Sequence, residues 1–358
     1  MNIKVVELHL LQSFPPSCVN RDGNNSPKDC TFGDARRARI SSQCLKRAIR
    51  QAESFHDTVG EAIALRSKRW RDEKLVPHLV SKDLSEAEAK KTADEFLESL
   101  ASKDTKRNEQ TSVGLYFGED EMLSLLDAYR NRSVDPKWKV KGKRKSADVA
   151  LFGRMLAKAA DMNVDAAAQI AHAISTHKLS QKMDYWIAAD DLKRQSEGED
   201  AGASMLGTAE FNASVFYRYG CVSLPVLKAN LGEDSITRKT VEAFLLASYD
   251  AIPTGKINGH GHFNPPYFAL AVVRRRGMPL NLANAFLEPV HSRNGKDIGT
   301  NSAVALLSHL ARMREMVPVD EATYLVAHAL SPGTLSMDGV AAEAGYRPLV
   351  DRVMEEFV

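Results

Sequence analysis

Residues 17–50 read SCVNRDGNNSPKDCTFGDARRARISSQCLKRAIR, and this stretch concentrates positive charge that the rest of the chain lacks. Residues 1–50 hold nine Lys or Arg against four Asp or Glu, a net charge of +5, whereas the remainder of the chain carries −3. A local basic surface of this kind is the electrostatic footprint of a protein that meets a polyanion, because each neutralised phosphate releases condensed counterions. We therefore expect an anion-binding surface here.

The end of this stretch has the pattern of an amphipathic helix that begins at Ser41 or Ser42. At 100° per residue the apolar side chains fall on one face and the polar ones on the other, with Leu45, Ala48, Ile49 and Ala52 opposite Gln43, Lys46, Arg47 and Arg50. Many surface helices carry charge opposite their apolar face. Residues 35–52, however, contain six Lys or Arg and no acid, so we expect a cationic stripe without local salt-bridge partners.

Residues 16–50 closely resemble the N-terminal signature of the Cas-seven-type backbone subunits of type I-E CRISPR surveillance complexes, called CasC in Cascade. Further patches of the same family follow in order: ALFGRM (150–155), AHAISTHKL (171–179), LGTAEFNASVFYRYG (206–220), FNPPYFALAVV (263–273) and PLNLANAFLEPV (279–290). The resemblance is weak or absent from about residue 53 to residue 144 and after about residue 302. Several ordered patches are stronger evidence than a single motif.

The resemblance implies an α+β fold with an RRM-like (ferredoxin-like) palm, an inserted helical finger region and a protruding thumb loop. In this chain the palm would comprise residues 1–53 and 148–358, with the thumb at about 188–220. Residues 54–147 would form the helical finger insertion with its basic loop. The residue pattern alone also suits a split βαβ arrangement better than a parallel doubly wound sheet.

The resemblance further implies a crRNA-binding backbone subunit that polymerises head to tail as a helical filament and presents the guide for pairing with target DNA. Its partners would be crRNA, the target strand, copies of itself and the CasA, CasB, CasD and CasE types of Cascade subunit. The RNA-binding positions that match the family are Arg21, Lys28, Ser41, Gln43, Lys46, Arg50, Met155 and Leu206. Ser41 is alternatively, or in addition, a helix N-cap, and Met155 and Leu206 are alternatively core residues.

The pattern along the chain predicts the other elements less directly. Expected strands lie at 3–12, 211–224 and 268–273, and expected helices at 150–160, 166–177 and 280–290, with RRRG (274–277) at a turn. Residues 54–129 interleave acids and bases as surface helices do. A basic loop is expected at 133–146, where Trp138 either stacks on a base or anchors the loop, and a solvated loop at 188–204. Met205 and Leu206, at its edge, either meet a partner or begin the next strand and pack into the palm.

Composition narrows the class of protein. The chain is 44% hydrophobic, so its 358 residues can bury a large core in one domain or two. We expect a cytoplasmic protein that does not contact a membrane, because no apolar run approaches the roughly 20 residues of a membrane span and the N-terminus lacks a signal-peptide pattern. The four cysteines (Cys18, Cys30, Cys44 and Cys221) form no C-x-x-C pair, so free thiols are expected.

No catalytic motif emerges, and we expect a protein that is not an enzyme and that has no metal or cofactor. His260 with His262, and His172 with His177, have poor spacing for metal ligands. The acids Asp22, Asp29, Asp34, Asp190 and Asp191 suit turns and pairing with nearby cations. Two alternatives stay open: a metal-dependent ribonuclease on an RRM-like palm, with one of these acids holding the metal, and an architectural DNA-binding protein.

Overall fold

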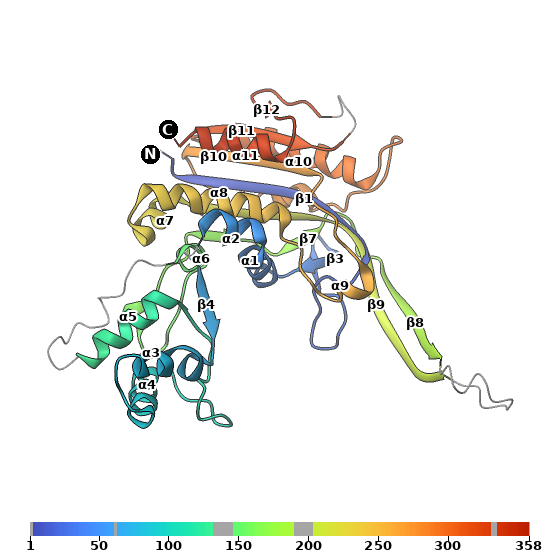
Figure 1. Ribbon diagram of the computed structural model, residues 1–358. Helices are drawn as coiled ribbons and strands as arrows, with labels where there is room; N and C mark the ends of the chain where they lie inside the picture. The colour runs from blue at the N-terminus through green and yellow to red at the C-terminus, as the bar shows by residue number, and fades with distance from the viewer. Residues whose placement is uncertain (1–2, 61–62, 132–145, 190–202, 331–334, 358) are drawn as a thin grey trace, which may run out of the picture.

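The computed structural model describes residues 3–60, 63–131, 146–189, 203–330 and 335–357. Figure 1 shows three parts: a body built on a large sheet, a helical finger (residues 63–131) beneath one side of it, and a long β-hairpin that projects from the other side. In the part of the chain described, no helix has the length and apolar character needed to cross a bilayer.

The body is a mixed α/β structure on a mainly antiparallel sheet. Within the described residues this sheet has ten strands, in the order β12-β11-β10-β1-β9-β7-β3-β2, with β6 and β8 also paired to β9. The strands are β1 (Val5–Ser17), β2 (Asp29–Phe32), β3 (Ala35–Ile40), β6 (Ala168–Ile170), β7 (Ala173–Ser175), β8 (Gln181–Ala189), β9 (Ala203–Ser223), β10 (Phe268–Arg276), β11 (Glu321–His328) and β12 (Ala341–Ala342). Among the strands that the structure describes, only the short β11–β12 pair is parallel.

Helices cover both faces of the sheet because the central strands alternate two apolar sets. In β1, Val6 and Leu8 point into the core shared with α1, α2, α6, α7, α8 and α11, whereas Val5 and Leu11 point towards α10. These helices are α1 (Ser42–Gln51), α2 (Glu53–Val59), α6 (Ala147–Phe152), α7 (Leu224–Leu231), α8 (Asp234–Asp250), α10 (Ile298–Met316) and α11 (Tyr346–Glu355). A short α9 (Ile257–His260) lies in a loop before β10. The predicted strands at 3–12, 211–224 and 268–273 are confirmed as β1, β9 and β10.

The finger has a core of its own. It consists of a two-stranded ribbon, a π-helical turn and three helices. In chain order these are β4 (Ala64–Ser67), the turn (Arg71–Leu75), α3 (Val76–Val80), α4 (Glu86–Leu100), β5 (Leu115–Gly118), which pairs with β4, and α5 (Glu119–Arg130). Trp70, Phe96 and Phe117 are fully buried among them. Segment 156–162, which follows α6, packs against the same core and so joins the finger to the body.

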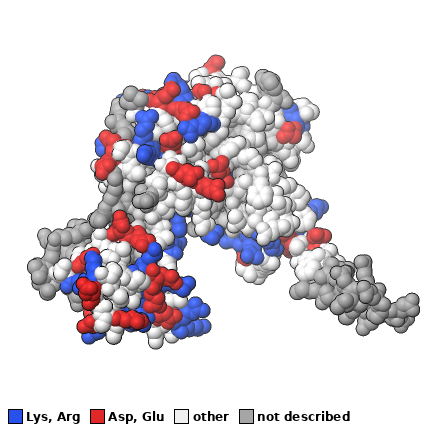
Figure 2. All heavy atoms as spheres, viewed as in Figure 1, with Lys and Arg blue, Asp and Glu red and all other residues white. Residues whose placement is uncertain are grey.

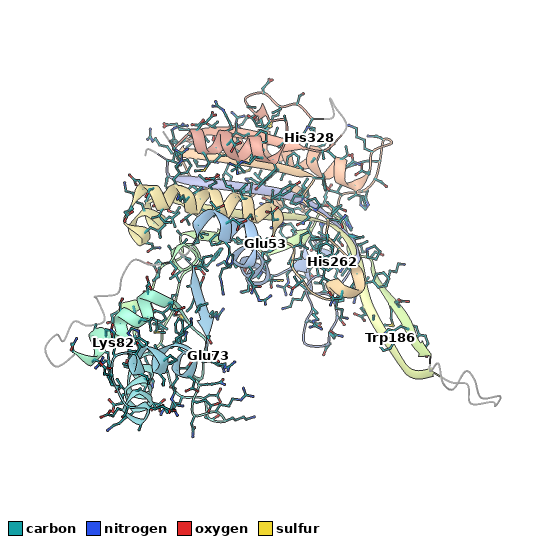
Figure 3. The ribbon with its side chains drawn as sticks, viewed as in Figure 1. Glu53, Glu73, Lys82, Trp186, His262 and His328 are labelled. Atoms are coloured by element: carbon teal, nitrogen blue, oxygen red, sulfur yellow. The ribbon has the colours of Figure 1, made fainter. Side chains whose placement is uncertain are left out.

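The hairpin projects because β9 extends beyond the point where β1, its neighbour in the sheet, ends. Its second half pairs with β1, and its first half pairs only with β8, from Gln181↔Asn212 to Ala189↔Ala203. Trp186 lies across Gly207, where an added Cβ would come within 2.5 Å of the indole ring. Figure 3 shows Trp186 far out on this hairpin. Part of the solvated loop expected at 188–204 is therefore strand, and residues 190–202 lie outside the described residues.

Two predicted helices are wrong. The first ends early, because α6 stops at Phe152 and Gly153 has φ +78°, with Val164 O only 2.9 Å from where a Cβ would lie. Residues 166–177 form β6 and β7, which pair with β9 at Ala168↔Val222 and Ile174↔Tyr217. The Ala-rich sequence has a high helix propensity, but pairing with a strand far along the chain overrides that preference.

The last third also differs from the prediction. Segment 280–290 contains only a 3-10 helix, Leu282–Phe286. The turn predicted at RRRG begins only at the last residue of the motif. Residues 274–276 are the end of β10, and the chain turns at Gly277, which has a φ of +95°. Arg274 is buried, for which apolar periodicity gave no signal.

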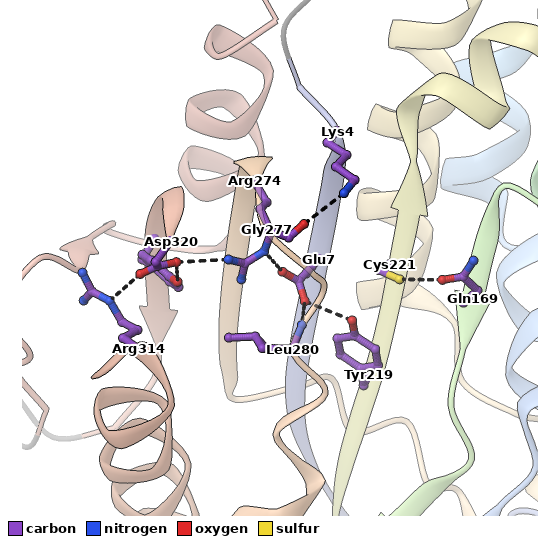
Figure 4. Close-up of polar contacts among 11 residues, drawn as sticks. Lys4, Glu7, Gln169, Tyr219, Cys221, Arg274, Gly277, Leu280, Arg314 and Asp320 are labelled. Carbon is purple, nitrogen blue, oxygen red and sulfur yellow. Dashed lines mark hydrogen bonds and ion pairs between the residues drawn. The ribbon is translucent and has the colours of Figure 1, made fainter. Parts of the chain in front are cut away.

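Burial of Arg274 is explained by a polar network that ties the central strands together (Figure 4). Glu7 on β1 accepts hydrogen bonds from Arg274 Nε at 2.8 Å, from the Tyr219 hydroxyl at 3.0 Å and from the Leu280 backbone N–H at 2.6 Å. Arg274 Nη1 also donates to Asp320 Oδ1 at 3.0 Å. Burial raises the pKa of Glu7, and Arg274 opposes that rise. The network joins β1 and β9 to β10 and to the residue that precedes β11.

Candidate nucleic-acid interface

Helix α1 forms where the sequence predicts it. The Ser41 hydroxyl accepts a hydrogen bond from the Cys44 backbone N–H at 3.3 Å and caps the helix, while Leu45 and Ile49 are buried beneath it. Ser41 itself is only 8% exposed, so its N-cap role is confirmed, and a contact of its hydroxyl with RNA stays a prediction. The opposite face of α1 carries Gln43 and the cationic side chains outward.

A cleft of about 680 Å³ lies between this face of α1 and the finger. It brings together four of the eight predicted contacts from distant parts of the chain, namely Gln43, Lys46, Arg50 and Met155. The finger contributes Arg66 from β4 and Tyr116 from β5. No pattern in the sequence indicates Arg66, because the fold of the finger is what brings it opposite α1.

Met155 lines the cleft from the segment that follows α6, next to the anchored Arg154. It is 87% exposed, which excludes the core alternative for this residue. Its neighbour Arg154 is buried, with Nη1 and Nη2 donating to the two carboxylate oxygens of Glu121 at 2.9 Å each, and its guanidinium lies 3.9 Å from the Phe117 ring centroid. The bidentate ion pair of Arg154 anchors the backbone from which the exposed Met155 side chain projects.

The cations of the basic stretch do not all stay unpaired, so that expectation is wrong in part. Arg36 pairs with Asp29, and Arg50 Nε lies 3.4 Å from Oδ2 of the buried Asp148. Arg37 is fully buried and donates only to backbone carbonyls, including those of Thr176 at 2.9 Å and Phe286 at 2.7 Å. The expected pairing of Asp29 with a nearby cation is confirmed, whereas the count over residues 35–52 missed Asp148 and both carbonyls, because they are distant in sequence.

Lys46 and Arg47 fit the expectation. Within the described residues, neither takes part in an ion pair. Lys46 is half-buried, and burial lowers the pKa of its ammonium group. A half-buried cation without an acid beside it favours an anionic ligand, because a phosphate would replace the hydration that burial removes.

A second cavity, of about 370 Å³, lies on the other side of α1. Arg21, Arg47 and Lys256 line it, and Arg47 belongs to both cavities. Asn25 accepts hydrogen bonds from two of these cations. Its Oδ1 accepts from Arg21 Nη1 at 2.8 Å, and its backbone oxygen accepts from Lys256 Nζ at 3.3 Å. Lys256 was not predicted, because a lone lysine in a loop carries no sequence signal.

Three predicted contacts line neither cavity, namely the N-cap Ser41, Lys28 and Leu206. Lys28 is half-buried on the approach to β2, where its backbone N–H donates to Asn20 O at 2.8 Å. Leu206 is in β9, opposite Ile187 in β8, and its side chain lies outside what the structure describes. Met205 pairs with Ala188 in the same way. Both residues therefore lie in β9 on the projecting hairpin, and their contact with RNA stays a prediction.

The possible metal ligands have other roles. Among the described residues, no group of three or more His, Cys, Asp or Glu side chains could hold a metal ion. His172 Nδ1 accepts from the Ser42 N–H at 2.8 Å, and the buried His262, labelled in Figure 3, contacts Pro253 O through Nε2 at 3.0 Å. Asp22 Oδ1 accepts two backbone N–H groups of its own turn. Asp190, Asp191 and Trp138 lie outside the described residues.

The thiols and the surface charge agree with the remaining expectations. All four cysteines are free. Figure 2 shows Lys and Arg side chains on the underside of the body, between the finger and the hairpin, near α1 and β3. The cationic surface therefore faces the space that the two projections flank.

Comparisons with known proteins agree with this geometry. A family model described as CT1975-like protein matches residues 6–351. A chain of a solved "CRISPR RNA-guided surveillance complex, pre-nicking" is similar over 99% of this chain and 100% of its own length, with 27% sequence identity and a TM-score of 0.84. A chain of a "CRISPR RNA-guided surveillance complex" shares the fold at 24% identity with a TM-score of 0.65 and the same coverage. No curated protein matches the sequence.

Proposed function

The chain belongs to the CT1975-like protein family, and from this premise we propose that it is a guide-RNA-binding subunit of a CRISPR surveillance complex. The observation that carries the proposal is the cleft beside α1, where Gln43, Lys46, Arg47 and Arg50 face an exposed Met155. The similarity to a surveillance-complex chain along the whole length supports the same assignment.

The chemistry of the cleft suits an RNA that is held without reading its sequence. Guide sequences differ from one complex to the next, so the carrier must grip phosphate and ribose and leave the base edges free to pair. Lys46 and Arg50 supply charged donors for phosphate oxygens, and Gln43 supplies an amide for a ribose hydroxyl. The exposed Met155 provides an apolar surface on which a displaced base would rest.

The finer assignment is also a proposal. The chain would be the CasC-type backbone subunit of a type I-E Cascade, with its central strands as an RRM-like palm. Copies would add head to tail along crRNA, pair the guide with a target DNA strand and contact the other Cascade subunit types. The hairpin, with Leu206 on β9, would reach the RNA held by the neighbouring copy. We propose no catalytic role, so Mg²⁺-dependent RNA cleavage by the purified protein, lost on Asp29→Asn, would select the ribonuclease alternative.

The test reverses the charge of Lys46, a half-buried cation of the cleft that takes part in no ion pair within the described residues. Lys46→Glu should abolish the RNA that copurifies with the protein, because it places a carboxylate where a phosphate would bind. Wild-type protein should carry RNA of discrete length with a common end, measured on a denaturing gel after extraction. The thermal melting temperature of the Lys46→Glu protein should stay within a few degrees of that of wild type, because Lys46 takes part in no ion pair among the described residues.

The matched control is Lys239→Glu, the same change at an exposed position on α8 outside both cavities. This variant should retain its RNA. If Lys46→Glu protein is folded and still copurifies with full-length RNA, the cleft is not the RNA site.

A further inference from the structure

Asp148 is a fully buried carboxylate at the joint between the body and the finger. It lies in the first turn of α6, the first described helix after the finger. Its Oδ1 accepts the backbone N–H of Ala64, the first residue of β4, at 2.9 Å, and that of Val149 at 3.0 Å. One carboxylate oxygen therefore holds the place where the chain enters the finger.

The second carboxylate oxygen of Asp148 lies next to Arg50, which lines the cleft proposed to bind RNA. Oδ2 is buried and, within the described residues, makes no hydrogen bond of standard geometry; Arg50 lies beside it, with Nε at 3.4 Å, and the hydroxyl of Tyr116 interacts with the same carboxylate. Burial raises the pKa of Asp148, and Arg50 is among the groups that oppose this rise. A buried carboxylate oxygen with one cationic neighbour fixes that neighbour, because removing the guanidinium would leave the charge without compensation.

Arg50 is held on two sides and free on the third. Its Nε edge faces Asp148, and its Cζ lies 4.9 Å from the centroid of the Tyr116 ring on β5. The structure gives Nη1 and Nη2 no partner among the described residues, and Arg50 lines the cleft. A planar guanidinium has donors on separate edges, so one edge can face a carboxylate while the other binds a phosphate.

We propose that Asp148 is a positioning residue for RNA binding, which holds Arg50 by its Nε edge so that the two terminal nitrogens point at a phosphate in the cleft. This inference rests on the proposed function, and it adds a buried residue that never touches RNA. The carboxylate has a second effect on the same site. Because Asp148 also anchors Ala64, it sets the position of the finger wall relative to α1.

A double-mutant cycle tests the proposal on full-length protein stripped of its RNA. Asp148→Asn keeps the shape and an acceptor for Ala64 but removes the charge that holds Arg50, and Arg50→Gln removes the phosphate contact. Binding is measured by fluorescence anisotropy with a labelled single-stranded RNA over a series of salt concentrations. Each single variant should weaken binding about tenfold and lower the slope of log affinity against log salt by slightly less than one.

The double variant decides between positioning and a general structural role. If Asp148 acts through Arg50, then Asp148→Asn with Arg50→Gln should bind no more weakly than Arg50→Gln alone. Losses that add, or an unchanged salt slope in Asp148→Asn, would overturn the proposal. Asp57→Asn, which removes an exposed acid from α2, is the charge-matched control and should bind as wild type or slightly more tightly.

A second variant keeps the test decisive if Asp148→Asn does not fold. Arg50→Lys keeps the positive charge but offers one ammonium group, which cannot reach the carboxylate and the phosphate from separate edges. It should lose most of the affinity that Arg50→Gln loses, and wild-type affinity would overturn the proposal. If Arg50→Gln binds as wild type, Arg50 is not a contact and Asp148 has nothing to position. The Lys46→Glu result then shows whether the proposed function fails as well.

Discussion

Residues of one charge have three different roles in the basic stretch. Arg37 is buried and donates to backbone carbonyls, Arg50 is paired with Asp148 at the edge of the cleft, and Lys46 is half-buried with no ion pair to a described residue. The sequence predicted where the positive charge gathers. It could not tell these roles apart, because each depends on atoms contributed from a distant part of the chain.

His9 provides a prediction at the scale of a single residue. It is buried in β1, with Nδ1 2.9 Å from the Tyr217 hydroxyl and its ring 5.0 Å from that of Tyr219. Burial, and to a lesser extent Arg274, lowers the pKa of His9 to about 3. Below its ordinary pKa of 6.5 the unfolded chain binds a proton that folded His9 refuses, so stability falls as pH falls from 6.5 towards 3.

The measurement compares wild type with His9→Gln by chemical denaturation at pH 7 and pH 5. The free energy of unfolding of wild type should fall between these values by about 2 kcal/mol more than that of the variant. The comparison depends on the pH-dependent difference, so any loss of packing in the variant cancels. Equal losses in the two proteins would show that His9 accepts a proton in the folded state.

At the scale of an element, α1 was predictable and β6 and β7 were not. The helix has its cap, its apolar face and its polar face within one short stretch, so local periodicity is sufficient. The strands β6 and β7 take their structure from pairing with β9, which no local pattern in Ala168 or Ile174 reports. The same limit applies to the site. Gln43, Lys46 and Arg50 follow from the helix, whereas Arg66, Lys256 and Asp148 follow from the fold.

The segment that ends α6 carries the element-scale prediction. Met155→Ser should leave the melting temperature nearly unchanged, because the side chain is 87% exposed, but should alter the nuclease protection of bound RNA near one nucleotide per copy. Gly153→Ala is the companion variant. A Cβ there would lie 2.9 Å from Val164 O, at a φ of 78° and a ψ of 165° that essentially only glycine adopts, so it should cost about 1–3 kcal/mol and displace Met155 as well. A large loss of melting temperature in Met155→Ser would contradict the exposed position.

At the scale of the whole molecule, the finger and the hairpin leave the body on opposite sides, with the cationic surface between them (Figures 1 and 2). Surfaces on opposite sides that differ in shape suit a heterologous contact, in which the hairpin of one copy meets the finger side of the next. A contact of this kind does not close on itself, so copies would continue along a bound strand.

Assembly length should therefore follow RNA length. Mixed with single-stranded RNAs of increasing length, the purified protein should form particles whose mass, measured by light scattering, rises in steps of one 39.5 kDa chain. The particles should dissociate steeply as salt rises, because every added copy neutralises further phosphates. Lys46→Glu should abolish the series, and Lys239→Glu should preserve it. A closed two-fold dimer whose mass is indifferent to RNA length would contradict the head-to-tail arrangement, since an isologous contact uses the same surface on both copies and leaves none for a third.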